Sequence, residues 1–183
     1  MHVMRMSLCC QRLALAAGIP AVQAEVIQLA APMHDIGKIG IPDHILLKPG
    51  KLDSQEWAVM QRHVTIGAEI IGTHDSNLMR TARAIALTHH ERWDGKGYPA
   101  GLAGEDIPIE GRIAAICDVY DALLSVRPYK PAWPEQKAMD LLREHSGQAF
   151  DPRLVPIFLE LAPEFAKIRD LYVDPPESTD DVR

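Results

Sequence analysis

The stretch HHERWDGKGYP, from His89 to Pro99, is the most distinctive string in this chain, because an adjacent histidine pair runs directly into a loop rich in glycine and charge. Further residues of metal-binding type lie elsewhere in the chain, namely the pair His34-Asp35, His63 and Asp118. An Asp carboxylate can bridge two cations while neutral His nitrogens fill the remaining coordination positions. A set of this size can hold two divalent metals at once, and two adjacent metals favour a hydrolase.

Helix geometry decides how the two adjacent pairs can bind. Successive residues on a helix point about 100° apart, so neither His34-Asp35 nor His89-His90 can chelate one ion as two histidines four residues apart do. Each pair can instead span two neighbouring ions, with Asp35 between them.

The surroundings of the other candidates support this interpretation. His63 falls among apolar residues at helical spacing and Asp118 among alanines, which directs both side chains toward a core. A single inward histidine is more often a hydrogen-bonded core residue than a ligand, and this is the default for His63 taken alone. Buried ionisable groups on several helices need partners, however, and a cation can serve them together. The full set with the following loop therefore favours a metal site.

The composition is that of one ordinary globular domain. The chain has 183 residues, of which 47% are apolar and 24% are charged, enough to bury a core. A net charge of −6 argues against DNA or RNA as a partner, since proteins that bind the nucleic-acid backbone usually carry a basic stripe.

No apolar run approaches the roughly 20 residues of a membrane span, and the first residues lack a signal-peptide pattern. We therefore expect a cytoplasmic protein without a membrane span.

Three cysteines, Cys9, Cys10 and Cys117, lie in apolar helical patterns. Their number is odd and two of them are adjacent. We expect reduced thiols in the core rather than a disulfide or a thiolate site.

The spacing of apolar residues predicts an all-α bundle of about seven helices, with no convincing alternating strand. Pro32 predicts a kink just before His34, Asp53 and Glu56 form a capping-box pattern, and Pro156 predicts an interruption of the last helix. Segments 40–51 and 94–108 are expected as loops, the first with one short turn, and the polar residues 173–183 as a disordered tail. The expected helices span 2–17, 20–34, 53–71, 76–90, 109–126, 134–144 and 152–161.

Several strings of the chain, in the same order, resemble the HD-GYP family, a branch of the HD-domain metal-dependent phosphohydrolases. These strings are MHDIGKIGIPD (33–43), ILLKPGKLDSQEW (45–57), HVTIGAEII (63–71), HHERWDGKGYPAGLAGEDIP (89–108), RIAAICDVYDALLSVRPYK (112–130) and SGQAFDP (146–152). The likeness extends from residue 2 to about residue 159, and so many ordered blocks make it highly specific. It implies a single-domain helical bundle of the HD-domain type over residues 1–172.

The resemblance also implies an activity, the hydrolysis of the bacterial second messenger cyclic di-GMP. The product is linear pGpG, with GMP as a further product left open, and the site holds two or three iron or manganese ions. Two metals can hold a shared hydroxide in line with phosphorus and neutralise the equatorial and leaving oxygens, so no side-chain nucleophile is required. We therefore expect a cyclic-guanylate-specific phosphodiesterase.

The functional residues of the family can be carried over by position. The expected metal ligands are His2, His34, Asp35, His63, His89, His90 and Asp118. Asp35 and Lys38 are expected to be catalytic, with the Lys38 ammonium near the scissile phosphate. The expected substrate contacts are Lys38, Tyr98 of the GYP loop, and the phosphate anchors Arg127 and Lys130.

One departure bears on the number of metals. In family members with a third metal, a glutamate lies one helical turn before the first-helix histidine, and here that position would precede Met1. We therefore expect a dinuclear site. Such domains usually follow a receiver or other sensor domain, which this chain does not contain, and the GYP loop is a candidate docking surface for a diguanylate cyclase.

Two other functions remain open at this point. A related HD enzyme acting on nucleotides or on guanosine tetraphosphate would share the helical core but would have no reason to carry the long GYP loop. A catalytically weak module that senses cyclic di-GMP or docks a protein would have lost metal ligands, and here the third-metal glutamate alone is missing. Metal content and turnover of cyclic di-GMP distinguish these alternatives.

Overall fold

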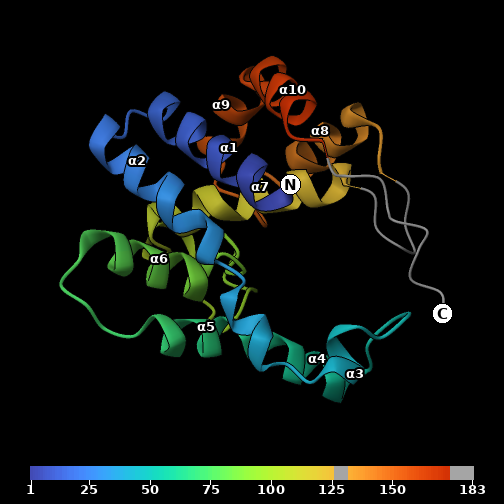
Figure 1. The fold of residues 1–183 in the computed structure, drawn as a ribbon. Coiled ribbons are helices and arrows are strands. Elements are labelled where there is room, and N and C mark those ends of the chain that lie inside the picture. The colour runs from blue at the N-terminus through green and yellow to red at the C-terminus, as the bar shows by residue number, and fades with distance from the viewer. Residues whose placement is uncertain (126–131, 174–183) are drawn as a thin grey trace.

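The computed structural model describes residues 1–125 and 132–173. These residues form the α-helices α1 to α10 and the 3₁₀ helices η1 to η3, and no β-strand occurs among them. Figure 1 shows the helices gathered into one bundle. The predicted all-α class is confirmed.

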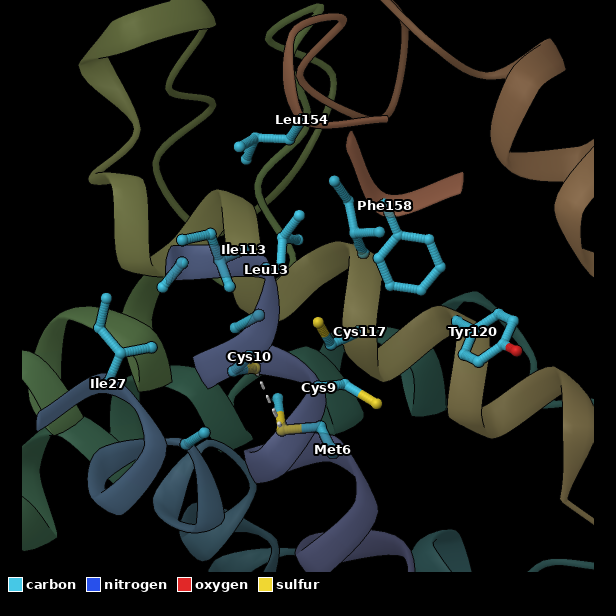
Figure 2. Close-up of a cluster of buried hydrophobic side chains, with 14 of the residues drawn as sticks. Met6, Cys9, Cys10, Leu13, Ile27, Ile113, Cys117, Tyr120, Leu154 and Phe158 are labelled. Carbon is cyan, nitrogen blue, oxygen red and sulfur yellow. Dashed lines mark hydrogen bonds between the residues drawn. The ribbon is translucent and has the colours of Figure 1, made fainter. Parts of the chain in front are cut away.

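The core forms where α1 (His2–Ala16) packs against α2 (Ala21–Ala30) and α7 (Ile109–Leu124). A further helix, α9 (Leu154–Glu160), adds side chains to the same cluster. Figure 2 shows buried side chains from all four helices converging, among them Met6, Cys10, Leu13, Ile27, Ile113 and Phe158. Burial of this apolar face fixes α1, which begins at His2.

The three cysteines belong to this core. Cys9, Cys10 and Cys117 are free and buried, which confirms the expectation of reduced core thiols. Burial raises the pKa of the Cys9 and Cys117 thiols, so neither is activated as a thiolate.

The predicted kink at Pro32 takes the form of a change in helix type. The α-helix α2 stops before Pro32, which lies in the 3₁₀ helix η1 (Ala31–Met33). Proline has no N–H and cannot continue the α-helical hydrogen bonds. A second 3₁₀ helix, η2 (Ile36–Gly40), follows at once. His34 and Asp35 therefore lie at the junction of two tight turns, not on the regular helix expected over 20–34.

The helix expected over 53–71 is divided in two, α4 (Ser54–Gln61) and α5 (His63–Ile71). The predicted capping box is present: Asp53 accepts hydrogen bonds from two backbone N–H groups of the first turn, and Glu56 accepts one from the backbone of Asp53. The division leaves His63 as the first residue of α5.

The short turn expected in segment 40–51 is α3 (Asp43–Leu46). No residue of α4 is buried, and Figure 1 shows α3 and α4 at the edge of the molecule. Lys48 donates to both carboxylate oxygens of Glu56, at 2.7 and 2.6 Å, and so joins the two helices. This pair of helices contributes little to the core.

The glycine- and proline-rich segment 94–108 lies between α6 (Asn77–Thr88) and α7, and it is an ordered loop, as predicted, with one 3₁₀ turn, η3 (Gly104–Asp106). A Cβ atom at Gly111 would lie 2.0 Å from Oγ1 of Thr88. The end of α6 and the start of α7 can therefore meet only because residue 111 is glycine.

Two further helices, α8 (Glu135–Glu144) and α10 (Ala162–Leu171), complete the described chain. The expected interruption at Pro156 is wrong. Pro156 lies in the first turn of α9, where an N–H has no helical partner and its loss costs nothing. The division at residue 62, the short α3 and the additional α10 raise the number of helices above the seven expected.

Among the described residues, none of the helices is long and apolar enough to cross a membrane. The longest, α7, has 16 residues, fewer than the roughly 20 that a span requires.

Candidate metal centre

Two clusters of potential ligand atoms lie next to each other, and within each cluster the atoms are within 4.8 Å of one another. The clusters consist of Asp35, His63, His89 and His90, and of His2, His34 and Asp118. All the predicted metal ligands therefore come together, from α1, the η1–η2 junction, the start of α5, the residues after α6, and α7. We refer to these seven residues as the metal centre.

The carboxylate of Asp35 connects the histidines. Its Oδ2 lies 3.3 Å from Nε2 of His34, and its Oδ1 lies 3.4 Å from Nε2 of His63 and 3.8 Å from Nε2 of His89. On the other side of His34, Oδ1 of Asp118 is 3.8 Å from the same Nε2. Asp35 thus occupies the position between the two clusters that the sequence predicted for a bridging ligand.

Backbone carbonyls orient three of the imidazoles. Nδ1 of His34 donates to the carbonyl of Ala31 at 2.9 Å, and Nδ1 of His63 donates to that of Met60 at 2.7 Å. Nδ1 of His89 donates in the same way to the preceding turn of α6. With its proton on Nδ1, each ring presents the lone pair of Nε2 to the Asp35 carboxylate, as metal-binding histidines usually do.

The metal centre contains buried polar atoms without partners in the described chain. They are Nε2 of His34, His63 and His89, and Oδ1 of Asp35. An unsatisfied buried polar atom costs about 1–3 kcal/mol, and four of them converge on one small region. A set of imidazole nitrogens and carboxylate oxygens suits divalent transition metals, so the residues present fit such an ion.

The charge states of these groups also suit a metal. Burial lowers the pKa of His63, His89 and His90, to about 3 for His90. Burial raises the pKa of Asp35, but its contacts with His34 and Lys38 outweigh burial and hold that pKa far below its usual range. The three histidines are therefore neutral and Asp35 is ionised near neutral pH, which are the forms that bind cations.

His34 differs from the other histidines. Burial lowers its pKa, but the carboxylates of Asp35 and then Asp118 outweigh burial and raise the pKa overall. The position between these carboxylates thus favours positive charge, whether a proton or a metal ion supplies it.

Lys38 lies on η2, one turn after Asp35, as the sequence predicted. Its ammonium donates a short hydrogen bond to Oδ2 of Asp35, and 42% of its side chain is exposed. The group is therefore anchored at the metal centre while part of it faces solvent.

A buried network that the sequence analysis missed holds His2. Nδ1 of His2 contacts Oδ2 of Asp121 at 2.7 Å, while Nε2 lies 3.5 Å from Oδ1 of Asp118. The Arg5 guanidinium donates two hydrogen bonds, of 2.6 and 2.9 Å, to the same Asp121 carboxylate. The spacing of Asp118 and Asp121, one helical turn apart, was the available signal for this positioning role.

The loop after His90 folds back over the metal centre. The ring of Tyr98 stacks on that of His90, with centroids 4.9 Å apart and an angle of 28° between the planes. A Cβ at Gly97 would lie 2.4 to 2.6 Å from backbone atoms of residues 90–92, so only glycine permits this approach. The loop thus brings Tyr98, a predicted substrate contact, to the site.

Glu91 fixes this loop, and sequence reasoning missed it. Its side chain is buried, and its two carboxylate oxygens accept hydrogen bonds from the backbone N–H groups of Ala100 at 2.8 Å and Leu102 at 3.0 Å. The available signal in the sequence was the place of Glu91 directly after the histidine pair.

The predicted phosphate anchors Arg127 and Lys130 lie outside the described residues.

Comparisons with known proteins identify the family of the chain. A family model for the HD domain matches residues 2–154. The chain is 51% identical over 168 residues to 3'3'-cGAMP-specific phosphodiesterase 2 of Vibrio cholerae, a match that covers 92% of this chain and 32% of that protein. It is 46% identical over 171 residues to a cyclic di-GMP phosphodiesterase of Thermotoga maritima, covering 93% of this chain and 46% of that protein.

The fold has solved counterparts. One is a structure described as an HDG"Y"P protein from Bdellovibrio bacteriovorus, with a TM-score of 0.67 at 20% identity, covering 88% of this chain and 51% of the other. At that identity the likeness concerns the fold. The chain spans 32% and 46% of the lengths of the two curated relatives.

Proposed function

Because the chain belongs to the HD domain family, with relatives of the HD-GYP type, we propose that it is a metal-dependent phosphodiesterase that hydrolyses cyclic di-GMP. The product is linear pGpG, with GMP as a second product if the enzyme acts again. The observation that carries this proposal is the convergence of seven ligand residues from five parts of the chain around buried atoms without partners.

Two divalent ions, iron or manganese, are the proposed cofactors. One would be held by Asp35, His63, His89 and His90, and the other by His2, His34 and Asp118, with Asp35 placed to bridge the two. When bound, such a pair supplies an activated water and neutralises charge on the phosphoryl group.

The protein's own side chains then position the substrate. The Lys38 ammonium, which contacts Asp35, is assigned to neutralise a non-bridging or departing oxygen of the scissile phosphate, and its place beside Asp35 supports this role. Tyr98 covers the site from the loop. Arg127 and Lys130 are assigned to the second phosphate from their place in the string SVRPYK, through a bidentate fork and a point charge.

The identity of the bases is a second question. The relative named for cyclic di-GMP and the relative named for 3'3'-cGAMP are similarly close, at 46% and 51% identity. Both substrates contain a guanine and two phosphodiester bonds in one ring, so the same phosphate chemistry applies. We propose cyclic di-GMP as the substrate and keep 3'3'-cGAMP as the alternative.

The setting of the enzyme is also a proposal. Because cyclic dinucleotides act as messengers inside bacterial cells, we place the activity in the cytoplasm. The curated relatives are two to three times as long as this chain, which leaves room in such proteins for a receiver or sensor domain that controls turnover. Docking of a diguanylate cyclase on the GYP loop stays a prediction from the sequence.

The test is turnover with defined metals. The purified protein, loaded anaerobically with Fe²⁺ or Mn²⁺, is incubated with cyclic di-GMP and separately with 3'3'-cGAMP, and the products are separated by chromatography. Consumption of cyclic di-GMP with release of pGpG supports the proposal, and faster consumption of 3'3'-cGAMP supports the alternative. Protein that binds two metals, binds cyclic di-GMP and cleaves neither substrate would be a sensor.

A further inference from the structure

A cavity of about 500 Å³ adjoins the metal centre, between the loop that follows His90 and the helices α4, α7 and α8. His89, His90 and Tyr98 are part of its lining. The cavity therefore opens beside the histidine pair of the proposed active site. Its volume lies within the range of small-molecule sites, about 300–1,000 Å³.

The walls of this cavity are largely apolar. Ala115 and Val119 of α7 and Leu141 of α8 form one side. Trp57 of α4 and Tyr98 form another, with their rings edge to face and their centroids 6.2 Å apart. Trp57 stays 47% exposed, on a helix that buries nothing. A half-exposed aromatic side chain beside an apolar cavity suits stacking on a planar heteroaromatic ring.

Among the described residues, the free polar groups at the cavity are an ammonium, an amide and an imidazole. The imidazole belongs to His145, whose buried Nδ1 has no hydrogen-bond partner in the described chain. Lys96 and Gln61 line it, and in the described part of the chain neither side chain has a hydrogen-bond or ion-pair partner. Glu91 also lines it, but both of its carboxylate oxygens already accept hydrogen bonds from the loop backbone. A ligand here therefore meets a strong donor at Lys96 and no available carboxylate on Glu91.

This polarity distinguishes the two purines. Guanine presents two acceptors, O6 and N7, on one edge, and a lysine can donate to both. Adenine presents an amino donor in place of O6, which would face the ammonium without a hydrogen bond. The carbonyl and amide of Gln61 can serve the donors and acceptors on the rest of a guanine.

We propose that this cavity is a base subsite that binds one guanine of the cyclic dinucleotide. Trp57 stacks on the base, the ring of Tyr98 stands edge to face beside it and bounds the cavity, and Lys96 donates to O6 and N7. The inference rests on the proposed function, which supplies the dinucleotide. A base held beside His90 places the attached phosphate toward the metal centre.

Two variants test the subsite through kinetics. Trp57→Ala removes a stacking ring, and Lys96→Met removes the ammonium while keeping the aliphatic stem. Each should raise KM for cyclic di-GMP by about 5- to 150-fold, the range for loss of one stacked base or one base-specific donor. Lys51→Met, an exposed lysine that does not line the cavity, is the control and should keep the wild-type KM. Wild-type KM in both test variants would overturn the subsite.

Binding of nucleosides separates this inference from the proposed function. Guanosine and adenosine carry no phosphate, so their binding requires neither metal nor turnover. Tryptophan fluorescence should report tighter binding of guanosine by the wild-type protein, and Lys96→Met should lose the preference. If no dinucleotide is cleaved but the guanosine preference is present, the proposed function fails and the subsite stands. If cyclic di-GMP is cleaved and guanosine binds no better than adenosine, the subsite fails alone.

Discussion

At Asp35 a single carboxylate faces three imidazoles and one ammonium. The Nε2 atoms of these histidines are buried and have no hydrogen-bond partner in the described residues. Lys38 contacts the same carboxylate from the solvent side. We therefore expect the two residues to have separable roles, Asp35 in holding cations and Lys38 in acting on the substrate.

Substitution of these two residues should give different results. Asp35→Ala removes the carboxylate shared by the metal centre and should reduce both metal content and activity. Lys38→Ala should retain the metals and slow turnover by about 10²- to 10³-fold, the loss expected for a group that stabilises transition-state charge. Elemental analysis of each purified variant, together with kcat, makes the comparison. Loss of metal from Lys38→Ala, or an unchanged kcat, would remove its assigned role.

We expect loss of the Arg5–Asp121 ion pair to lower the free energy of unfolding substantially. Both side chains are almost fully buried, with relative exposures of 3% and 5%, and Asp121→Ala removes the carboxylate that accepts two hydrogen bonds from Arg5. The free energy of unfolding should fall by about 3–5 kcal/mol, measured by urea denaturation. The double variant Arg5→Met/Asp121→Leu removes both charges and should recover part of the loss. A double variant no more stable than Asp121→Ala would contradict this account.

At the scale of the elements, apolar periodicity predicted where helices occur but not where they break. The pattern over 53–71 is continuous, yet the chain divides at Arg62 into α4 and α5. The cause is contact with a distant segment. A Cβ at Gly37 would lie 1.9 Å from the carbonyl oxygen of His63, so η2 packs directly on the backbone of α5. Such a contact between segments has no local pattern in the sequence.

The metal centre likewise combines residues that a local sequence pattern identifies with residues that only contacts between distant segments reveal. Its candidate ligands could be named from the sequence because of their residue types and family positions, and the structure brings these residues together. Glu91 and Asp121 could not be named in this way, since Glu91 acts on backbone N–H groups about ten residues away and Asp121 contacts His2, 119 positions distant. Residues that hold ligands in place are recognised from packing and not from residue type.

The loop after His90 should be sensitive to added volume at one position. Gly97→Ala places a Cβ within 2.6 Å of the neighbouring backbone, so the loop must shift and separate Tyr98 from His90. KM for cyclic di-GMP should rise at least about 10-fold. Gly101→Ala is a matched control in the same loop: its φ of 68° is strained for alanine, but its nearest contact is 3.4 Å. Equal effects of the two variants on KM would show that general loop strain is the cause.

At the scale of the whole molecule, Asp151 joins the start of α7 to the segment before α9. Its carboxylate accepts from Arg112 at 2.7 Å and from Arg153 at 3.2 Å. The guanidinium groups lie 5.9 and 5.4 Å from the ring centroid of Trp93 in the loop after His90. One buried carboxylate thus connects the C-terminal helices with the loop that covers the metal centre.

This network predicts how stability depends on pH. Burial raises the pKa of Asp151, but hydrogen bonds from Arg153 and Arg112 outweigh burial and lower the pKa overall. A depressed folded-state pKa adds stability above the unfolded value of about 3.9, and this stability is lost as the pH falls through the folded value. Asp151→Asn should therefore be less stable than wild type by about 1–3 kcal/mol at pH 7. The difference in free energy of unfolding between the wild type and Asp151→Asn should become smaller below about pH 4. Urea denaturation across that range measures it, and a constant difference would refute the assignment.

Metal binding should stabilise the whole fold. An ion that binds the folded chain at 100 times its Kd adds about 2.7 kcal/mol, and for a chain of this size Tm should rise by about 5–10 °C. Thermal unfolding with Mn²⁺ and with a chelator makes the measurement. Asp35→Ala, which lacks the shared carboxylate, should show a much smaller difference, and an equal shift in that variant would place the stabilising ion elsewhere.

The contact between His2 and Asp121 joins residues 119 positions apart. A ribosome adds about 5–20 residues per second, so roughly 6 to 24 s separate the synthesis of these two side chains. During that interval α1 has neither α7 to pack against nor the carboxylates that hold its histidine. If the proposed metals bind, we expect the nascent chain to acquire its full complement only after α7 has left the exit tunnel, so that a cell must supply metal at that later stage.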